Sequence, residues 1–123
     1  MNSQILEVIL NSFFRHQLKI KMYHFQTQHY GAHKASDSYL GTFESNLDKF
    51  MEIGQGIVGK FNTKSISIKF DTLNDETINF ELDKFVSTLR AFDEIMKGQT
   101  ELLNLRDEMI GNAEQFKYLL TFK

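Results

Sequence analysis

The sequence predicts an all-α protein, a four-helix bundle with a long crossover between its second and third helices. The 123 residues include no proline, which leaves long helices uninterrupted. Apolar residues recur at intervals of three and four over most of the chain, as in helices that bury one face. One stretch near the middle alternates instead, which favours an extended segment. The length suits a single domain covering residues 1–123.

The first two helices are predicted over residues 3–29 and 33–55, and the short turn between them makes them antiparallel. Ser3 is the expected N-cap of the first helix, and Gly31 is expected to end it. A glycine cluster at residues 54–59 is expected to end the second helix. The predicted buried stripes are Leu6, Ile9, Phe13, His16, Ile20, Tyr23 and His24 in the first helix and Leu40, Phe43, Leu47 and Phe50 in the second.

The alternating stretch is Ser-Ile-Ser-Ile-Lys-Phe, within residues 62–74. Thirteen extended residues span roughly 40 Å, enough to return the chain along the length of a bundle. A third helix is predicted over residues 76–97, with Asp75 as N-cap and Gly98 as its stop. A fourth helix follows from Thr100. The apolar residues of these two helices are Ile78, Leu82, Phe85, Leu89, Phe92 and Met96, then Leu102, Leu105, Met109, Phe116, Leu119 and Leu120.

Composition excludes several classes of protein. The absence of cysteine excludes disulfide scaffolds, thiolate metal sites and cysteine nucleophiles. A net charge of −2, from 14 basic and 16 acidic residues, gives no general attraction to nucleic acid. No apolar run is long enough for a transmembrane helix, and the first residues do not resemble a secretory signal. We therefore expect a soluble protein of the cytoplasm, with no membrane partner.

The residues with the strongest chemical signal lie on the predicted second helix. On a helical wheel His33, Asp37, Glu44, Asp48 and Glu52 fall within one stripe roughly 100° wide, beside the apolar stripe. Acids alone are typical of a solvated helix face. Imidazole and carboxylate groups together suit divalent first-row metal ions. The stripe therefore predicts a metal site between packed helices.

The spacing of His33, Asp48 and Glu52 resembles the ferroxidase signature of the Dps family of mini-ferritins. In that family a histidine ends the first helix, a second histidine begins the next, and an Asp and a Glu follow one turn apart. His24, between two aromatic residues, resembles the first histidine, and Asp37 matches an additional acid. The two histidines are closer together here than in the family, which implies a shorter turn. The resemblance covers roughly residues 20–55.

Membership of this ferritin-like family would imply several properties. The chain would bind iron and oxidise Fe(II) with oxygen or peroxide, for iron detoxification or protection from oxidative stress. The ligands His24, His33, Asp37, Asp48 and Glu52 would form a site between two subunits. The two histidines would come from one subunit, and Asp48 and Glu52 from its two-fold partner. The protein would then be at least a dimer, with a twelve-subunit shell as a larger form, and would need no organic cofactor.

Two other interpretations stay open. A non-catalytic structural or particle-associated module would keep the fold without iron chemistry. Compact Dps-like proteins of phages and large DNA viruses resemble this chain, and a viral source would allow a virion location. A nucleic-acid coat is the least favoured interpretation, because Dps relatives bind DNA through basic tails and this chain has only Lys123 at its end. We do not expect DNA as a partner.

Two polar groups on the apolar faces have structural interpretations. His16 lies on the inward stripe of the first helix, two turns before His24, and is expected to be hydrogen-bonded inside the bundle or covered at an interface. Arg106 is expected to form ion pairs between helices with Asp107 or Glu108. No Glu-x-x-His pair occurs, which argues against the intra-bundle di-iron site of larger ferritins.

Overall fold

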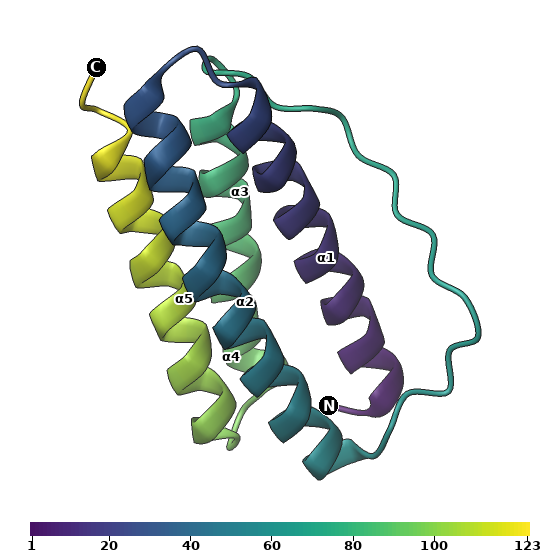
Figure 1. The fold of residues 1–123 in the computed structure, drawn as a ribbon. Coiled ribbons are helices and arrows are strands. Elements are labelled where there is room, and N and C mark those ends of the chain that lie inside the picture. The colour runs from purple at the N-terminus through teal and green to yellow at the C-terminus, as the bar shows by residue number, and fades with distance from the viewer.

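A computed structural model describes all 123 residues and contains only helices and the segments that connect them. The long helices pack side by side as a bundle (Figure 1). This confirms the predicted all-α architecture. Their bounds are α1 Ser3–Gln26, α2 Tyr30–Val58, α3 Ile78–Arg90 and α5 Thr100–Leu119, with the short α4, Phe92–Ile95, directly after α3.

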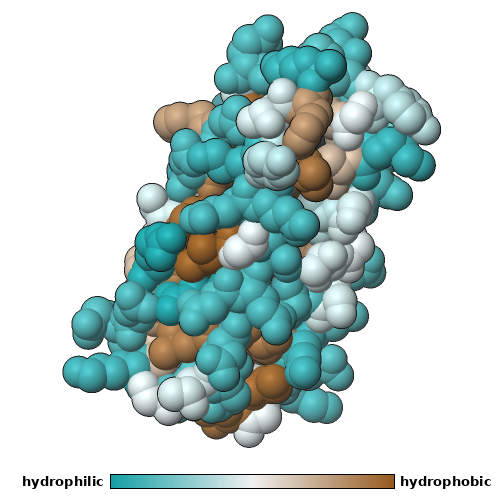
Figure 2. All heavy atoms as spheres, turned by 90° about the vertical axis from the view of Figure 1, so that its left-hand side faces the viewer, coloured by the Kyte–Doolittle hydropathy of each residue, from teal (hydrophilic) through white to brown (hydrophobic).

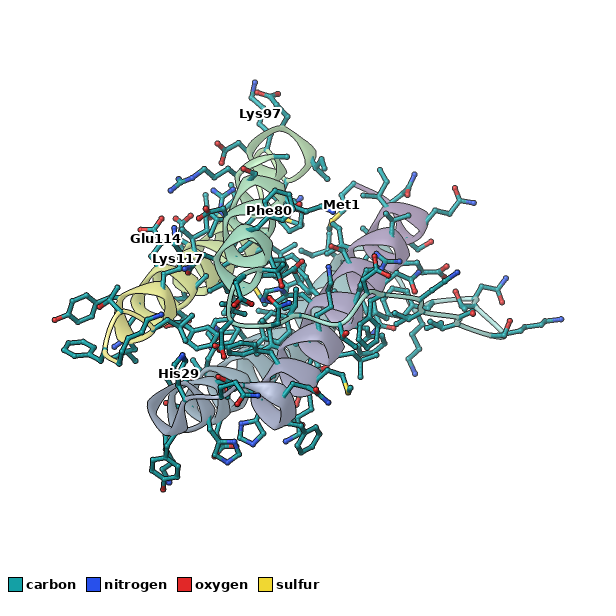
Figure 3. The ribbon with its side chains drawn as sticks, turned by 90° about the horizontal axis from the view of Figure 1, so that it is seen from above. Met1, His29, Phe80, Lys97, Glu114 and Lys117 are labelled. Atoms are coloured by element: carbon teal, nitrogen blue, oxygen red, sulfur yellow. The ribbon has the colours of Figure 1, made fainter.

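The segment between α2 and α3 is the long crossover that the alternating pattern predicts. Residues 59–77 leave the lower end of α2 and return along the outer side of α1 to the opposite end of the bundle (Figure 1). Seen along the bundle from above, this segment projects to one side of the helices (Figure 3). Because the crossover reverses the chain once more, α2 and α3 run in the same direction, and α5 runs opposite to both.

The core is centred on Phe13 of α1. Its ring meets the rings of Phe43 and Phe50 on α2 and Phe85 on α3, with centroids 6.0, 5.3 and 5.9 Å away in edge-to-face arrangements. Such geometry adds to the free energy gained by burying the rings. The apolar residues predicted to face inward are buried, with the exceptions of Leu119 and Leu120 near the end of α5.

Two predicted helix ends are wrong, and the glycine cluster expected to end α2 does so only through its last member, Gly59. Asn2, not Ser3, caps α1, and its side chain accepts a hydrogen bond of 2.9 Å from the Ile5 N–H. Gly31 lies in the first turn of α2, because α1 already ends at the extended Thr27. Gly54 does not end α2, which continues to Val58 and stops before Gly59 at a φ of 95°. Ser3 and Gly54 thus lie inside the helices that they were expected to bound, and Gly31 lies inside the next helix.

Asp75 does not cap α3, because its carboxylate serves the α1–α2 turn. It accepts hydrogen bonds from the Thr27 hydroxyl at 2.6 Å, the Tyr23 hydroxyl at 2.8 Å and the Gln28 N–H at 3.0 Å. Partial burial raises the pKa of Asp75, but these donors outweigh it and lower the pKa below its usual range. The neighbouring Asn74 bonds the N–H groups that precede α3. Asp75 thus ties the end of the crossover to the turn between α1 and α2.

The predicted third helix is interrupted at Ala91, and Arg106 of α5 occupies the break. Its guanidinium donates to the Leu89 carbonyl at 2.8 Å and to the carboxylates of Asp93 at 2.6 Å and Asp107 at 2.8 Å. Arg106 therefore pairs with Asp107, but within α5 and not between helices as expected; its ion pair with another helix is formed with Asp93 of α4. A φ of 87° at Gly98 accompanies the predicted stop.

The side of the bundle on which α5 lies is covered mainly by hydrophilic residues, and its hydrophobic residues form separate patches (Figure 2). No helix combines the length and the apolar character that a membrane span needs.

Candidate metal centre

His24 and His33 form a stacked pair beside the turn between α1 and α2. Their ring centroids are 4.0 Å apart and the ring planes differ by 17°. Nδ1 of His24 lies 2.9 Å from the backbone oxygen of His33, and Nδ1 of His33 lies 2.8 Å from the backbone oxygen of His24. Each histidine therefore holds the ring of the other through the backbone. The short turn brings the last turn of α1 against the first turn of α2 and so makes this pairing geometrically accessible.

These hydrogen bonds determine the tautomer of both rings. A backbone carbonyl can only accept, so Nδ1 of each histidine carries the proton and donates it. Ser36 supports the arrangement, because its hydroxyl lies 2.9 Å from both Nδ1 of His24 and the carbonyl of His33. In the neutral rings the unprotonated nitrogen is then Nε2, which keeps a free lone pair. Metal-binding histidines are commonly oriented in this way, with the other ring nitrogen bonded to a carbonyl.

Two further rings and two lysines flank the pair. The ring of Tyr30 stacks near His33 at 6.2 Å and that of Phe25 lies edge-on to His24 at 5.5 Å. The ammonium groups of Lys34 and Lys21 lie 6.0 and 5.2 Å from the centroids of the Tyr30 and Phe25 rings, respectively. His24 is only 8% exposed, while Tyr30 and Phe25 are 75% and 64% exposed. The histidine pair is thus fixed within a surface that is otherwise open to a partner.

The predicted carboxylate ligands lie far from the histidines in a single chain. Asp48 and Glu52 are exposed, and neither forms an ion pair or a side-chain hydrogen bond. At a rise of about 1.5 Å per residue, Asp48 lies about 22 Å and Glu52 about 28 Å from His33 along α2. Asp37 is also exposed and is not grouped with the histidines. No three His, Asp or Glu side chains of one chain lie close enough together to hold a metal ion.

The histidines and carboxylates nevertheless share the surface formed by α1 and α2. A shallow hollow lined by Leu10, Phe14, Leu47 and Met51 carries Asp48 and Glu52. A second hollow lies between this one and the histidine pair. Its lining residues are Gln17, Leu18, Lys21, Asp37, Leu40, Gly41 and Glu44.

Gly41 lies near the middle of this surface, eight residues after His33 and seven before Asp48. It is exposed, and a Cβ added there would meet no atom within 4 Å. A small residue at this point leaves room for the close approach of another helix.

A buried polar network lies deeper in the bundle, and the sequence pattern indicated only its histidine. Nδ1 of His16 donates to Glu81 at 2.8 Å, and Nε2 of His16 lies 2.7 Å from the Tyr39 hydroxyl. The Lys19 ammonium lies 2.8 Å from the other oxygen of Glu81. The His16 ring stacks on Phe85 at a centroid distance of 3.6 Å. The expected hydrogen bonding of His16 inside the bundle is therefore confirmed.

The pKa directions agree with one protonation pattern in this network. Burial lowers the pKa of His16 despite the neighbouring carboxylate of Glu81. Burial raises the pKa of Glu81, but the hydrogen bonds from His16 and Lys19 outweigh this and lower it. Burial raises the pKa of Tyr39 above its ordinary range. The network thus combines a neutral imidazole, an ionised carboxylate, an ammonium and a protonated phenol.

One sequence signal could have revealed this network. Glu81 lies three residues after Ile78 and four before Phe85, on the apolar stripe of the third helix. An acid on a buried stripe needs a partner, and His16 on the inward stripe of the first helix is a natural one. Tyr39 carries no comparable signal, because tyrosine is common in apolar cores.

Comparison with known proteins gives one positive result. No curated protein matches the chain, and no solved structure does. Residues 24–120 match a protein family described as a family of unknown function, DUF5856. The matching region begins at His24 and contains all five predicted ligands. Because it covers most of the chain, the protein belongs to the DUF5856 family.

Proposed function

We propose that two copies of this chain form a ferritin-like, Dps-like iron site that oxidises Fe(II), for iron detoxification or protection from oxidative stress. His24 and His33 of one subunit and Asp48 and Glu52 of the other would bind the metal ion. The observation that carries the proposal is the histidine pair, whose Nδ1 atoms are both engaged by backbone carbonyls. This leaves both Nε2 lone pairs free for a metal ion. Because the stacked rings are nearly parallel, one ring would turn for both nitrogens to bind the same ion.

The positions along α2 fit a two-fold symmetric assembly. A two-fold axis near Gly41 would place His33 of each subunit opposite Asp48 of the other, because both lie nearly equally far from Gly41. An isologous interface of this kind forms two identical sites at once. Lys21 on one side of Gly41 and Glu44 on the other would also face each other across the axis. The distance along α2 between His33 and Asp48 prevents a site within one chain, and a two-fold dimer needs this same distance.

The combined ligand set suits iron chemistry. Imidazole nitrogen is a good ligand for Fe(II), and carboxylate oxygens are hard donors that favour the Fe(III) product. Asp48 and Glu52 are free of other partners and could therefore move toward a metal ion at little cost. Asp37, one turn beyond His33, would remain near the site as an additional acid that attracts cations. Oxygen or peroxide would accept the electrons.

The second candidate is a non-catalytic helical module of an assembly or particle. One observation favours it: a single chain contains no complete group of metal ligands. In that case the exposed carboxylates of α2 would be ordinary solvated residues. The histidine pair would then only stabilise the α1–α2 turn.

Anaerobic titration with Fe(II), followed by exposure to oxygen or peroxide, separates the two candidates. We expect one high-affinity Fe(II) site per subunit and rapid oxidation in the parent protein. Asp48→Ala and Glu52→Ala should each abolish rapid oxidation while circular dichroism shows an intact fold, since both side chains are exposed. Glu108→Ala, which removes an exposed and unpaired acid of α5, is the matched control. If Asp48→Ala oxidises iron as fast as the parent, the non-catalytic module is the better description.

A further inference from the structure

The contacts of the Tyr39 hydroxyl distinguish it from the other tyrosines. It lies 2.7 Å from Nε2 of His16, whose Nδ1 donates to Glu81 at 2.8 Å. Tyr39 and His16 are 6% and 1% exposed, so water does not replace this contact. The buried phenol of Tyr39 is therefore hydrogen-bonded directly to the neutral imidazole of His16, and the carboxylate of Glu81 is bonded to the other nitrogen of that ring.

The composition makes this arrangement chemically significant. The chain contains no tryptophan and no cysteine, so its four tyrosines and five methionines are its principal oxidisable side chains. Tyr30 and Tyr118 are exposed, and Tyr23 bonds the carboxylate of Asp75 at 2.8 Å. The remaining rings of the core are phenylalanines, which are much harder to oxidise. Tyr39 contacts two of them, Phe43 at 6.0 Å and Phe116 at 4.9 Å.

We propose that Tyr39 is a redox-active tyrosine that gives up one electron and passes its phenolic proton to His16. A one-electron oxidant, such as an oxidised metal complex, takes the electron and is reduced. The O–H bond of Tyr39 breaks, and its proton forms a bond to Nε2 of His16. The products are a neutral tyrosyl radical and an imidazolium whose positive charge faces Glu81. One electron from an external reductant, with return of the proton, restores the phenol.

The geometry lowers the barrier to this step. Loss of an electron makes a phenol strongly acidic, so a base already in hydrogen-bond contact removes the need to form a charged radical in the apolar core. His16 is held in place by Glu81 and by its stack on Phe85 at 3.6 Å, so little reorganisation is required. Asp75, the partner of Tyr23, already accepts hydrogen bonds from the Thr27 hydroxyl at 2.6 Å and the Gln28 N–H at 3.0 Å, which makes it a poorer proton acceptor.

This function would protect the protein against oxidants formed near it. Tyr39 lies six residues after His33, about 9 Å further along α2. An oxidant produced at that end of the bundle could take its electron from Tyr39 before it attacks a core methionine. The redox step itself does not depend on a metal site, and it can be tested with an oxidant generated in solution.

The test is flash photolysis with a ruthenium tris(bipyridine) photosensitiser and an external electron acceptor, with the radical detected by electron paramagnetic resonance. The parent should give a tyrosyl radical that persists after exposed radicals have decayed. Tyr39→Phe should lose this long-lived signal, and Tyr23→Phe, the matched buried control, should keep it. His16→Gln should slow Tyr39 oxidation by about 10²-fold, a typical contribution of a positioned proton acceptor. Solvent D₂O should slow oxidation in the parent but not in His16→Gln.

Three results would overturn the proposal: no long-lived radical in the parent, the same signal in Tyr39→Phe, or its loss in Tyr23→Phe alone. Where His16→Gln fails to fold, the comparison of Tyr39→Phe with Tyr23→Phe still shows which tyrosine holds the radical. The absence of a D₂O effect in the parent would then overturn the proton transfer. Because no iron is present in this experiment, its outcome is independent of the proposed Fe(II) oxidation.

Discussion

At the scale of single residues, hydrogen bonds to ring nitrogens separate the two kinds of buried histidine in this protein. His16 uses both ring nitrogens within the core, one on Glu81 and one on Tyr39. His24 uses only Nδ1, on a backbone carbonyl and Ser36. Both ring nitrogens of His16 are therefore hydrogen-bonded within the protein, while Nε2 of His24 has no hydrogen-bond partner. The same residue type on one helix face thus makes two different sets of hydrogen bonds.

His16→Ala should lower the free energy of unfolding by about 2–4 kcal/mol, because it leaves a cavity and removes partners from two buried polar groups. Rapid Fe(II) oxidation should remain. His29→Ala, which changes a partly exposed histidine at the α1–α2 turn, is the control and should cost less than about 1 kcal/mol. Urea unfolding followed by circular dichroism measures both changes. Equal losses in the two variants would show that the His16 network adds nothing to stability.

Stability should fall as the pH falls from about 7.5 to about 5.5. The folded protein lowers the pKa of His16 below its ordinary value of 6.5. In this range the unfolded chain therefore takes up a proton that the folded chain refuses. Glu81 also has a lowered pKa, and its contribution is lost only at still lower pH, below its ordinary value of 4.5. Urea unfolding at several pH values in this range gives the free energy of unfolding as a function of pH. This free energy should depend less on pH in His16→Gln than in the parent. An unchanged pH dependence would contradict the lowered pKa of His16.

At the scale of elements, the close approach of α1 and α2 depends on Gly54. A Cβ added there would lie 2.9 Å from both terminal carbons of the buried Leu6 side chain. Gly54→Ala should therefore destabilise the protein by about 1–2 kcal/mol through overpacking. Gly56→Ala is the matched control, since nothing lies within 4 Å of its added Cβ, and it should stabilise α2 by about 0.5–1 kcal/mol. Thermal unfolding of the two variants should shift in opposite directions, and a parallel shift would contradict the packing described here.

The elements themselves were largely predictable from the sequence, because periodicity reports which residues a helix buries. The stripe from Leu6 to His24 and the alternation in residues 62–74 gave the helices and the crossover without any knowledge of contacts. The helix ends were not predictable in this way. Asn2 replaced the expected cap of α1, and Asn74 bonds the N–H groups just before α3. Several neighbouring polar residues can serve the same N–H groups, and only tertiary contacts decide among them. Asp75, for example, does not cap α3 because its carboxylate accepts hydrogen bonds from the α1–α2 turn.

The candidate site was predictable only in part, for a physical reason. The resemblance to the Dps family joined His24 to His33 across a short turn, and the structure places their rings in contact. Residue spacing placed Asp48 and Glu52 on the same side of α2, but periodicity carries no information about a second chain. A site that combines the histidines of one chain with Asp48 and Glu52 of another therefore stays a prediction.

At the scale of the whole molecule, the distribution of charge bears on nucleic acid. Basic residues are paired with acids on the surface, as in Lys117 with Asp83 and Arg90 with Glu114. Their fields largely cancel beyond a Debye length of about 8 Å. We therefore expect weak or no DNA binding at physiological salt, as judged by gel shift. A sharp complex at submicromolar protein would instead favour a DNA-coating role.

Assembly is the other property of the whole molecule that the proposal requires. The exposed Phe25 and Tyr30 beside the histidine pair, and the hollow that carries Asp48 and Glu52, are surfaces that a second copy would cover. Light scattering should show at least a dimer at micromolar concentration. A stable monomer near the 14.4 kDa of one chain would remove the inter-subunit site.

Complementation between two inactive variants tests the central claim most directly. One variant carries His24→Ala and His33→Ala, and the other carries Asp48→Ala and Glu52→Ala. Each alone should fail to oxidise Fe(II) rapidly. Refolded together in equal amounts, they should recover about a quarter of the parental activity, because half of the dimers are mixed and each of these holds one complete site. No recovery in dimers shown to be mixed, or full activity in either variant alone, would contradict a site shared between two subunits.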